Sequence, residues 1–141
     1  MDTQEMLNEI RKTTDMGVVG IEAVVQRTGE QLLRKALYQQ KLEYEALYRD
    51  ADRLLQKRGG SRHNVPSNAK RMAAMSSQMR LMRGPVDSKI AGMMIEGNTK
   101  GMIKSYQTIR QMGQSDPETL ALSRKLLDTE LHNIEQMKKF L

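Results

Sequence analysis

Residues 58–84 read RGGSRHNVPSNAKRMAAMSSQMRLMRG, and this stretch decides the fold. It starts at a glycine pair that can end a helix, and it runs to Gly84-Pro85, where the next long helical pattern begins. A connection of this length far exceeds the roughly two to eight residues that usually join neighbouring helices of a bundle. We therefore expect the chain to cross here from one end of a helical bundle to the other.

The segments on both sides of this crossover have the apolar spacing of long amphipathic helices. Asp2-Thr3-Gln4-Glu5 has the form of a capping box, and so does Ser115-Asp116-Pro117-Glu118, which adds a proline in the first turn. No strand-like alternation of useful length appears. The sequence therefore predicts an all-α fold in one domain over residues 1–141, with helices over residues 3–28, 30–58, 67–83, 87–112 and 116–140.

Short connections join the long helices in pairs, one near residue 29 and the other near residue 114. Connections this short leave room only for antiparallel hairpins. The crossover then links the first hairpin to the second and carries the short helix over residues 67–83. We expect a four-helix bundle of two antiparallel hairpins, with a short extra helix in the long connection between them.

The composition indicates a soluble helical protein. The 141 residues include 12 methionines, one phenylalanine and no tryptophan or cysteine, which excludes disulfides, thiolate catalysis and cysteine-ligated metal sites. The sequence has no run of 18 apolar residues, and its first residues, MDTQEMLNEIRK, lack the basic and then apolar order of a signal peptide. We expect a cytoplasmic protein that does not enter a membrane.

The positive charge of the chain is local. The net charge is +6, yet the segment 53–86 holds eight Lys or Arg residues and no acid, so the rest of the chain sums to −2. Clustered positive charge suits phosphate groups, although the segment has no aromatic residue on which a base could stack. The candidate anion-binding residues are Arg53, Lys57, Arg58, Arg62, Lys70, Arg71, Arg80 and Arg83.

The methionines of the crossover share one face of its predicted helix. Such a face is typical of packing against a core, and methionine fills irregular gaps well. A short helix on the outside of a bundle also has surface left for a second subunit. The candidate residues for core packing or for a homodimer interface are Met72, Met75, Met79 and Met82.

Each long helix carries polar residues among its apolar ones, at heights that match in the expected topology. This predicted polar layer comprises Thr14, Gln40, Glu43, Asn98 and Glu130. Tyr44 and Tyr48 fall on the inner face nearby, where each hydroxyl needs a buried partner, and the carboxyl of Glu130 or Glu43 is the candidate acceptor. We expect the layer to be a hydrogen-bonded structural feature that fixes the alignment of the helices.

Four glycines lie in the middle of long helices: Gly17, Gly20, Gly97 and Gly101. Each costs about 0.5 to 1 kcal/mol of stability relative to alanine, so each position should offer a compensating advantage. The favoured explanation is close packing between the first and third long helices. The alternative is a small cavity or ligand space in the polar layer.

Two glycine-containing stretches match each other, DMGVVGIEAV at residues 15–24 and IEGNTKGMIKSYQ at residues 95–107. Together with the helix lengths and the crossover helix, they give the whole chain a pattern that resembles the ferritin-like superfamily, in particular its small bacterial stress-type bundles. The resemblance implies a ferritin-like four-helix bundle.

Catalytic members of that superfamily hold two iron ions with a Glu from each of two helices and a Glu-x-x-His from each of the other two. At the matching positions this chain has Gly17, Asn98, Gln40-x-x-Glu43 and Glu130-x-x-Asn133. Only Glu43 and Glu130 remain as weak candidate metal ligands. The resemblance therefore implies an incomplete di-iron site, and we expect no cofactor and no enzymatic activity.

Three functions follow from these observations. The favoured one is a non-catalytic structural or protein-interaction module that forms a homodimer. The second is weak, sequence-independent binding of nucleic acid or another polyanion through the basic crossover. The third is a degenerate metal-binding protein of the di-iron type. No histidine supports an active site, because His63 lies in a loop without a ligand neighbour and His132 falls on an outer face.

Overall fold

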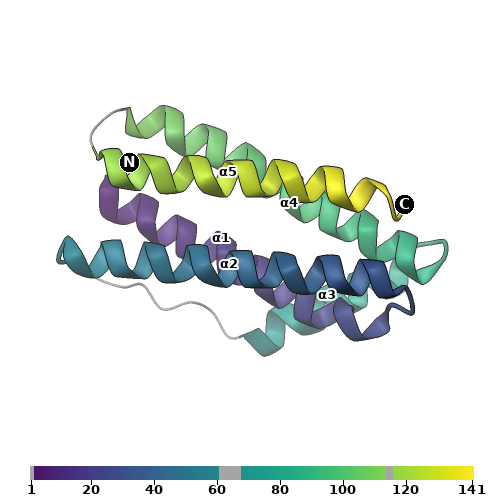
Figure 1. Ribbon diagram of the computed structural model, residues 1–141. Coiled ribbons are helices and arrows are strands. Elements are labelled where there is room, and N and C mark those ends of the chain that lie inside the picture. Colours follow the sequence, from purple (N-terminus) through teal and green to yellow (C-terminus); the bar gives the residue numbers. More distant parts are fainter. Residues whose placement is uncertain (1, 61–67, 114–115) are drawn as a thin grey trace.

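A computed structural model describes residues 2–60, 68–113 and 116–141, and it confirms the predicted all-α class (Figure 1). In these three ranges the chain forms five α-helices and no strand. They are α1 (Thr3–Val24), α2 (Gln31–Lys57), α3 (Asn68–Leu81), α4 (Val86–Met112) and α5 (Pro117–Lys138). A short 3₁₀ turn, η1 (Val25–Arg27), follows α1, so α1 ends before residue 28, where the prediction had placed its end. None of the helices in the described ranges is both long and apolar enough to cross a membrane.

Helices α1, α2 and α5 begin where a side chain can accept a hydrogen bond from an otherwise unpaired backbone amide. Asp2 and Glu5 form the predicted capping box, with the Glu5 amide donating to Asp2 Oδ1 at 2.7 Å and the Asp2 amide donating to Glu5 Oε2 at 3.2 Å. Glu30 caps α2 by accepting from the amide of Leu32 at 3.0 Å. At α5 the capping side chain is that of Asp116, with Pro117 in the first turn.

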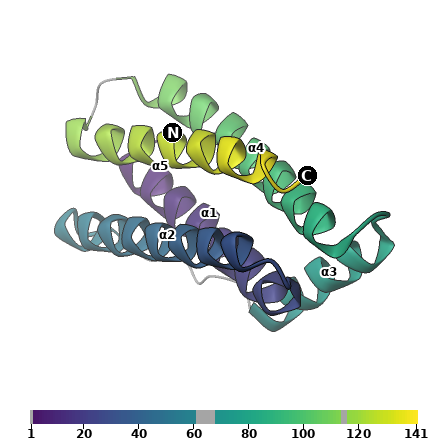
Figure 2. The ribbon, with the colours of Figure 1, turned by 45° about the vertical axis from the view of Figure 1, so that its right-hand side comes forward.

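The four long helices form two antiparallel hairpins, α1 with α2 and α4 with α5 (Figures 1 and 2). Helices α2 and α4 run in the same direction, so the chain between them travels back along the length of the molecule. Helix α3 lies on this return path and packs against α1 and α4. The hairpins contact each other through α1 with α4 and through α2 with α5. The long crossover thus has the role that the sequence predicted.

Apolar side chains from all four long helices fill the space between the hairpins. The fully buried members include Met6, Leu7, Ile21, Leu33, Leu37, Leu47, Leu55, Ile90 and Met137. Most of them recur at helical spacing within their own helix, as the sequence pattern requires. Their burial is the main source of stability for a chain without disulfides.

Polar contacts tie the two hairpins together at both ends of the bundle. At one end, the Arg58 guanidinium donates to both carboxylate oxygens of Asp116, at 2.5 and 2.9 Å. At the other end, the Thr28 hydroxyl donates to Asp87 Oδ1 at 2.5 Å. These contacts fix the register of one hairpin against the other, because a shift along the bundle axis would break both.

Helix α3 is held against the bundle by its methionines and by two polar contacts. Met79 is only 5% exposed, and Met75 and Met82 pack against the core. Arg71 forms an ion pair with Asp15 of α1, and the Gln78 amide donates to Glu96 Oε2 of α4 at 3.3 Å. Of the two alternatives left open for the methionine face, core packing therefore applies to Met79, Met75 and Met82, and Met79 is too buried to contact a second subunit.

Candidate functional site

A buried polar cluster lies where α2, α4 and α5 face one another. Its members are Tyr44, Asn98, Glu130 and Asn133, each no more than 4% exposed. The Tyr44 hydroxyl oxygen lies 2.6 Å from Asn98 Oδ1 and 3.1 Å from Glu130 Oε2. Asn133 Nδ2 donates to Asn98 Oδ1 at 3.3 Å and weakly to the Tyr44 hydroxyl at 3.4 Å. Three helices are thus joined through one phenol oxygen.

The hydrogen bonds of this cluster favour a proton on Glu130. Asn98 Nδ2 donates to the carbonyl of Met94 at 2.7 Å, so Asn98 Oδ1 can only accept. The single proton of the Tyr44 hydroxyl then goes to Asn98, its nearer acceptor. The Tyr44 hydroxyl can instead donate to Glu130 Oε2, but it then no longer donates to Asn98, so a carboxyl of Glu130 that donates to Tyr44 satisfies all three groups. A neutral Glu130 therefore satisfies the cluster, whereas a carboxylate competes with Asn98 for the same proton.

The position of Glu130 favours the same protonation state. Burial disfavours its charged form and raises the pKa of Glu130 to about 8, against an ordinary value of 4.5. Burial also raises the pKa of Tyr44 well above its ordinary value, and negative charge at Glu130 raises it further. At neutral pH the cluster is therefore an uncharged group of donors and acceptors.

Two of the mid-helix glycines make room for this cluster. A Cβ atom at Gly17 would lie 2.6 Å from the ring of Tyr44, and one at Gly101 would lie 2.6 Å from Glu130 Oε1. Contacts this short do not occur for real Cβ atoms, so the ring and the carboxyl occupy the space that the glycines leave. Gly20 does the same for Met75 of α3 at 2.9 Å. A side chain at Gly97, by contrast, would meet nothing within 4 Å.

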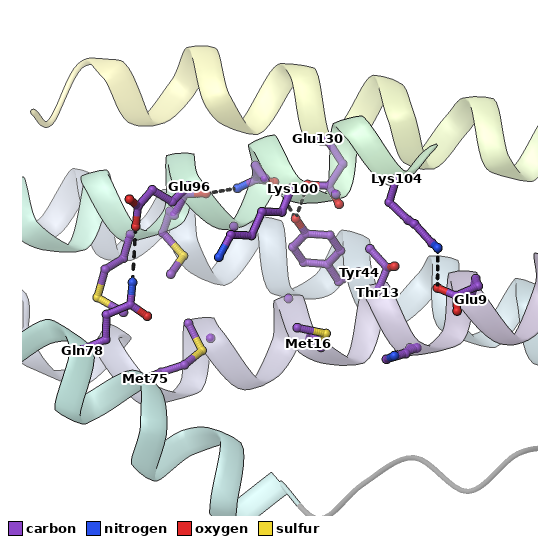
Figure 3. A pocket seen from close by; sticks show the side chains of 18 residues that line it. Glu9, Thr13, Met16, Tyr44, Met75, Gln78, Glu96, Lys100, Lys104 and Glu130 are labelled. Carbon is purple, nitrogen blue, oxygen red and sulfur yellow. Dashed lines mark hydrogen bonds and ion pairs between the residues drawn. The ribbon is translucent and has the colours of Figure 1, made fainter. Parts of the chain in front are cut away.

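Gly97 faces a pocket of about 420 Å³ that opens between α1 and α4 (Figure 3). This volume lies within the range of roughly 300 to 1,000 Å³ that is usual for small-molecule sites. The apolar walls come mainly from methionines of α1, α3 and α4, and the polar cluster contributes Tyr44, Asn98 and Glu130 to the lining. The methionines are Met16, Met75, Met93 and Met94. The pocket is thus an apolar space with a hydrogen-bonding group at its inner end.

Charged side chains surround the exposed side of the pocket. Lys104 of α4 lies 4.0 Å from Glu9 of α1, an ion pair that spans the two helices that flank the pocket. Glu96 accepts the hydrogen bond from Gln78, so α3 also borders the pocket. Lys100 lies between Glu96 and Lys104 on α4, as Figure 3 shows.

The predicted polar layer is only partly the same as this cluster. Asn98 and Glu130 lie in it, whereas Thr14 is buried but donates to the carbonyl of Ile10 in its own helix at 2.8 Å. Gln40 is buried and donates to Gln136 Oε1 at 2.8 Å. Glu43 is half-buried and has no place in the cluster. Thr14 and Gln40 are thus buried and hydrogen-bonded as predicted, but outside the cluster, and only Glu43, the neighbour of the inward-facing Tyr44, is not buried.

The structure adds two buried polar residues to those of the predicted polar layer. Asn133 joins the cluster one turn after Glu130 on the same face of α5, a spacing that could have indicated it. Arg11 is 6% exposed and lies outside the cluster, where it donates to the Tyr48 hydroxyl at 3.0 Å and pairs with Asp52 at 3.4 Å. An arginine within an apolar stripe has no local signal for burial, because both partners come from another helix. Tyr48 is accordingly half-buried.

The donor atoms around Glu130 do not fit a di-iron centre. Its neighbours are a phenol and two amides, and two iron ions need several bridging carboxylates and imidazoles. Among the described residues, no three His, Cys, Asp or Glu side chains gather closely enough to hold a metal ion. Glu43 and Glu130 therefore do not combine into a metal site in this arrangement.

The basic segment is less free than the sequence suggested, because acids from other parts of the chain meet it. Arg58 pairs with Asp116 and Glu118, Lys57 with Glu118, Arg53 with Asp50 and Arg71 with Asp15. Lys70, Arg80 and Arg83 are exposed, and within the described ranges they form no ion pair. Arg62 and His63 lie outside the described residues. Four of the eight candidate residues are thus already paired with acids, and Lys70, Arg80 and Arg83 stay candidates for binding an anion.

The fold and the site define an all-helical protein with a polar-ended pocket between two antiparallel hairpins. Among solved structures, the chain is similar to a DUF305 fragment from Deinococcus radiodurans, with a TM-score of 0.77 over 97% of this chain and 93% of that one. The two sequences are 14% identical, so the similarity extends to the fold alone. No family model matches the chain, and no curated protein matches it either.

Proposed function

We propose that this protein is a non-catalytic interaction module with a ferritin-like bundle fold, and that it works by binding a small molecule in the pocket between α1 and α4. The observation that carries the proposal is Gly97. A mid-helix glycine costs about 0.5 to 1 kcal/mol relative to alanine, and this one is an exposed residue of the pocket lining, where an added Cβ atom would meet nothing within 4 Å. At Gly17, Gly20 and Gly101 the corresponding space is occupied by the chain itself.

The shape and chemistry of the pocket support the same proposal. Small-molecule sites combine apolar walls with a few convergent polar groups, and here the methionines provide the walls and Tyr44 and Glu130 provide the polar groups. The described residues that line the pocket include no serine, cysteine or histidine, the side chains that most often carry nucleophilic catalysis. A binding role therefore accounts for the site better than catalysis does.

The neutral dye N-phenyl-1-naphthylamine, which fluoresces in apolar surroundings, tests the proposal. We expect saturable binding of one dye per chain to the wild type, and a loss of at least about tenfold in affinity for Gly97→Leu, which adds a bulky side chain to the pocket lining. Gln107→Leu is the matched control, since it adds the same side chain at an exposed position of α4 outside the lining. Equal dye binding by all three proteins, or none by any, would contradict the proposal.

We also propose that the module forms a homodimer. Ile103 and Tyr106 support this, because they are large apolar side chains, 49% and 54% exposed, three residues apart on α4. We expect light scattering at micromolar concentration to give twice the chain mass of 16.1 kDa. A mass of one chain, retained at higher concentration, would remove the dimer from the proposal without affecting the pocket.

Weak polyanion binding is the second candidate, and the exposed side chains of Lys70, Arg80 and Arg83 favour it. We expect retardation of DNA that weakens steeply with salt and is reduced when these three residues become Ser. Lys125→Ser is the control, because Lys125 is an exposed lysine of α5, away from this region. DNA retardation that is unchanged by the triple substitution would count against this candidate.

The degenerate di-iron hypothesis is tested by metal analysis after aerobic expression with added iron. The phenol and amides around Glu130 favour less than one iron per chain. Two irons per chain that are lost in Glu130→Ala would overturn the proposal of a non-catalytic bundle.

A further inference from the structure

We infer that the pocket between α1 and α4 takes an amphipathic anion: an apolar ring system with one acidic group, whose rings lie among the methionines and whose acidic group lies beside Lys100. This inference rests on the proposed small-molecule function and adds the chemical class of the ligand. Three features of the pocket support this ligand class: the charges at its mouth, its apolar walls and its neutral inner end.

The mouth of the pocket favours negative charge. Its charged residues are Glu9, Lys12, Glu96, Lys100 and Lys104, three bases against two acids. Glu9 is already paired with Lys104, and Glu96 accepts a hydrogen bond from Gln78. Within the described ranges Lys12 and Lys100 form no ion pair, so their ammonium groups are available to a ligand. An acidic group at the mouth would neutralise the excess positive charge.

The walls favour rings. Met16, Met75, Met93 and Met94 line the pocket with flexible, polarisable side chains that adapt to flat apolar surfaces. Gly97 exposes the backbone of α4 to the same space. A planar ring system can lie against bare backbone on one side and against thioethers on the other, an arrangement that a bulky aliphatic side chain at residue 97 would prevent.

The inner end does not oppose an anion, and it offers nothing to a cation. Glu130 is the acid of the polar cluster, and its raised pKa of about 8 keeps it neutral at pH 7. A cationic ligand would therefore meet a net positive mouth, with three lysines against two carboxylates, and no carboxylate inside. A neutral Glu130 and the Tyr44 hydroxyl can still exchange hydrogen bonds with a polar atom on the far side of the ligand.

The test compares two dyes with the same skeleton. N-phenyl-1-naphthylamine is neutral, and 8-anilinonaphthalene-1-sulfonate is the same molecule with one sulfonate. We expect the sulfonate to bind the wild type more tightly at low salt, and the difference to narrow as salt screens the charges. We expect Lys100→Gln to weaken binding of the sulfonate dye roughly two- to fivefold, which corresponds to one partly exposed ion pair. The affinity for the neutral dye should not change.

Two further variants show whether an observed change in dye binding comes from the pocket. Lys125→Gln removes the same charge from an exposed position of α5 outside the pocket and should change neither affinity. Gly97→Leu should abolish the tighter binding of the sulfonate if that binding occurs in the pocket. If both dyes bind equally well, or if Lys100→Gln does not reduce their difference, the anion inference is wrong and the proposed binding function stands. If Gly97→Leu affects neither dye, the proposed function fails with it.

Discussion

The hydroxyl of Tyr44 on α2 meets the carboxyl of Glu130 on α5 at 3.1 Å, and both groups are buried at the inner end of the pocket. This contact joins the two hairpins at mid-bundle, far from the ion pair of Arg58 with Asp116 at one end. Because it places an ionisable group among neutral partners, it makes the stability of the fold depend on the protonation of Glu130.

The substitution Glu130→Gln should remove a fall in stability between about pH 4.5 and pH 8. The pKa of Glu130 is about 8 in the folded protein and 4.5 without the burial, so between these values the folded state binds more protons than the unfolded state. Stability therefore falls as pH rises through this window, by up to about 1.4 kcal/mol per pH unit. The amide cannot ionise, so the variant should lack this slope.

Urea unfolding of both proteins at pH 5, 7 and 9 measures this effect. We expect the variant to gain on the wild type steadily with pH, and Glu135→Gln to follow the wild type, because Glu135 is an exposed acid of the same helix. Parallel pH profiles for wild type and Glu130→Gln would mean that Glu130 is not buried in its neutral form.

Removing only the hydroxyl, as in Tyr44→Phe, should destabilise the protein by about 1 to 3 kcal/mol, because Asn98 Oδ1 and the Glu130 carboxyl lose their shared buried partner. The control is Tyr38→Phe, whose hydroxyl accepts from Gln26 in an exposed position and should matter by less than about 0.5 kcal/mol. Urea unfolding at pH 7 compares the two. Equal effects would show that the cluster adds nothing to stability.

Apolar periodicity and the signals for helix ends were enough to predict the helices and the long crossover, because both depend on residues close together in the sequence. The members of the polar cluster were harder to predict. Tyr44 and Glu43 are neighbours on α2, and a rotation of one residue decides which of them points inward. The sequence predicted that the Tyr44 hydroxyl would bond to Glu130 or Glu43. It did not show that Tyr44 would be the centre of the hydrogen-bond network.

The pocket could not be predicted from the sequence. The glycines indicated either close packing or a cavity, and the structure contains both: Gly17, Gly20 and Gly101 are filled by neighbouring side chains, and Gly97 borders open space. Which outcome occurs at each glycine depends on where another helix places its side chains. The pairing of Arg71 with Asp15 was hidden for the same reason, since 56 residues separate the two.

Alanine substitutions at Gly97 and Gly17 should change the stability of the protein in opposite directions. Gly97→Ala should stabilise the protein by about 0.5 to 1 kcal/mol, because alanine is the better helix former and its Cβ meets nothing. Gly17→Ala should destabilise it, because its Cβ would lie 2.6 Å from the rigid ring of Tyr44. Thermal melts of the two variants test this, and shifts of the same sign would contradict the assignment of open and filled space.

The contact of Arg58 with Asp116 should govern stability in acid. Hydrogen bonds from Arg58, and then from Thr119, lower the pKa of Asp116 to about 2 from its ordinary 3.8. The folded carboxyl therefore binds its proton less tightly than the unfolded one, so its contribution is complete above pH 3.8 and is lost as pH falls towards 2. Asp116→Asn should weaken this contribution and flatten the acid limb.

Acid unfolding followed by circular dichroism measures the change, and the loss at pH 7 should be about 1 kcal/mol, the size of a helix cap contribution. Asp128→Asn is the control, because Asp128 is an exposed acid of α5 away from the hairpin junction. The two variants should therefore differ in both the midpoint and the steepness of acid unfolding. If Asp116→Asn unfolds at the same pH as wild type and control, the junction between α2 and α5 does not depend on this ion pair, and the register of the hairpins is set by the apolar core and the buried cluster instead.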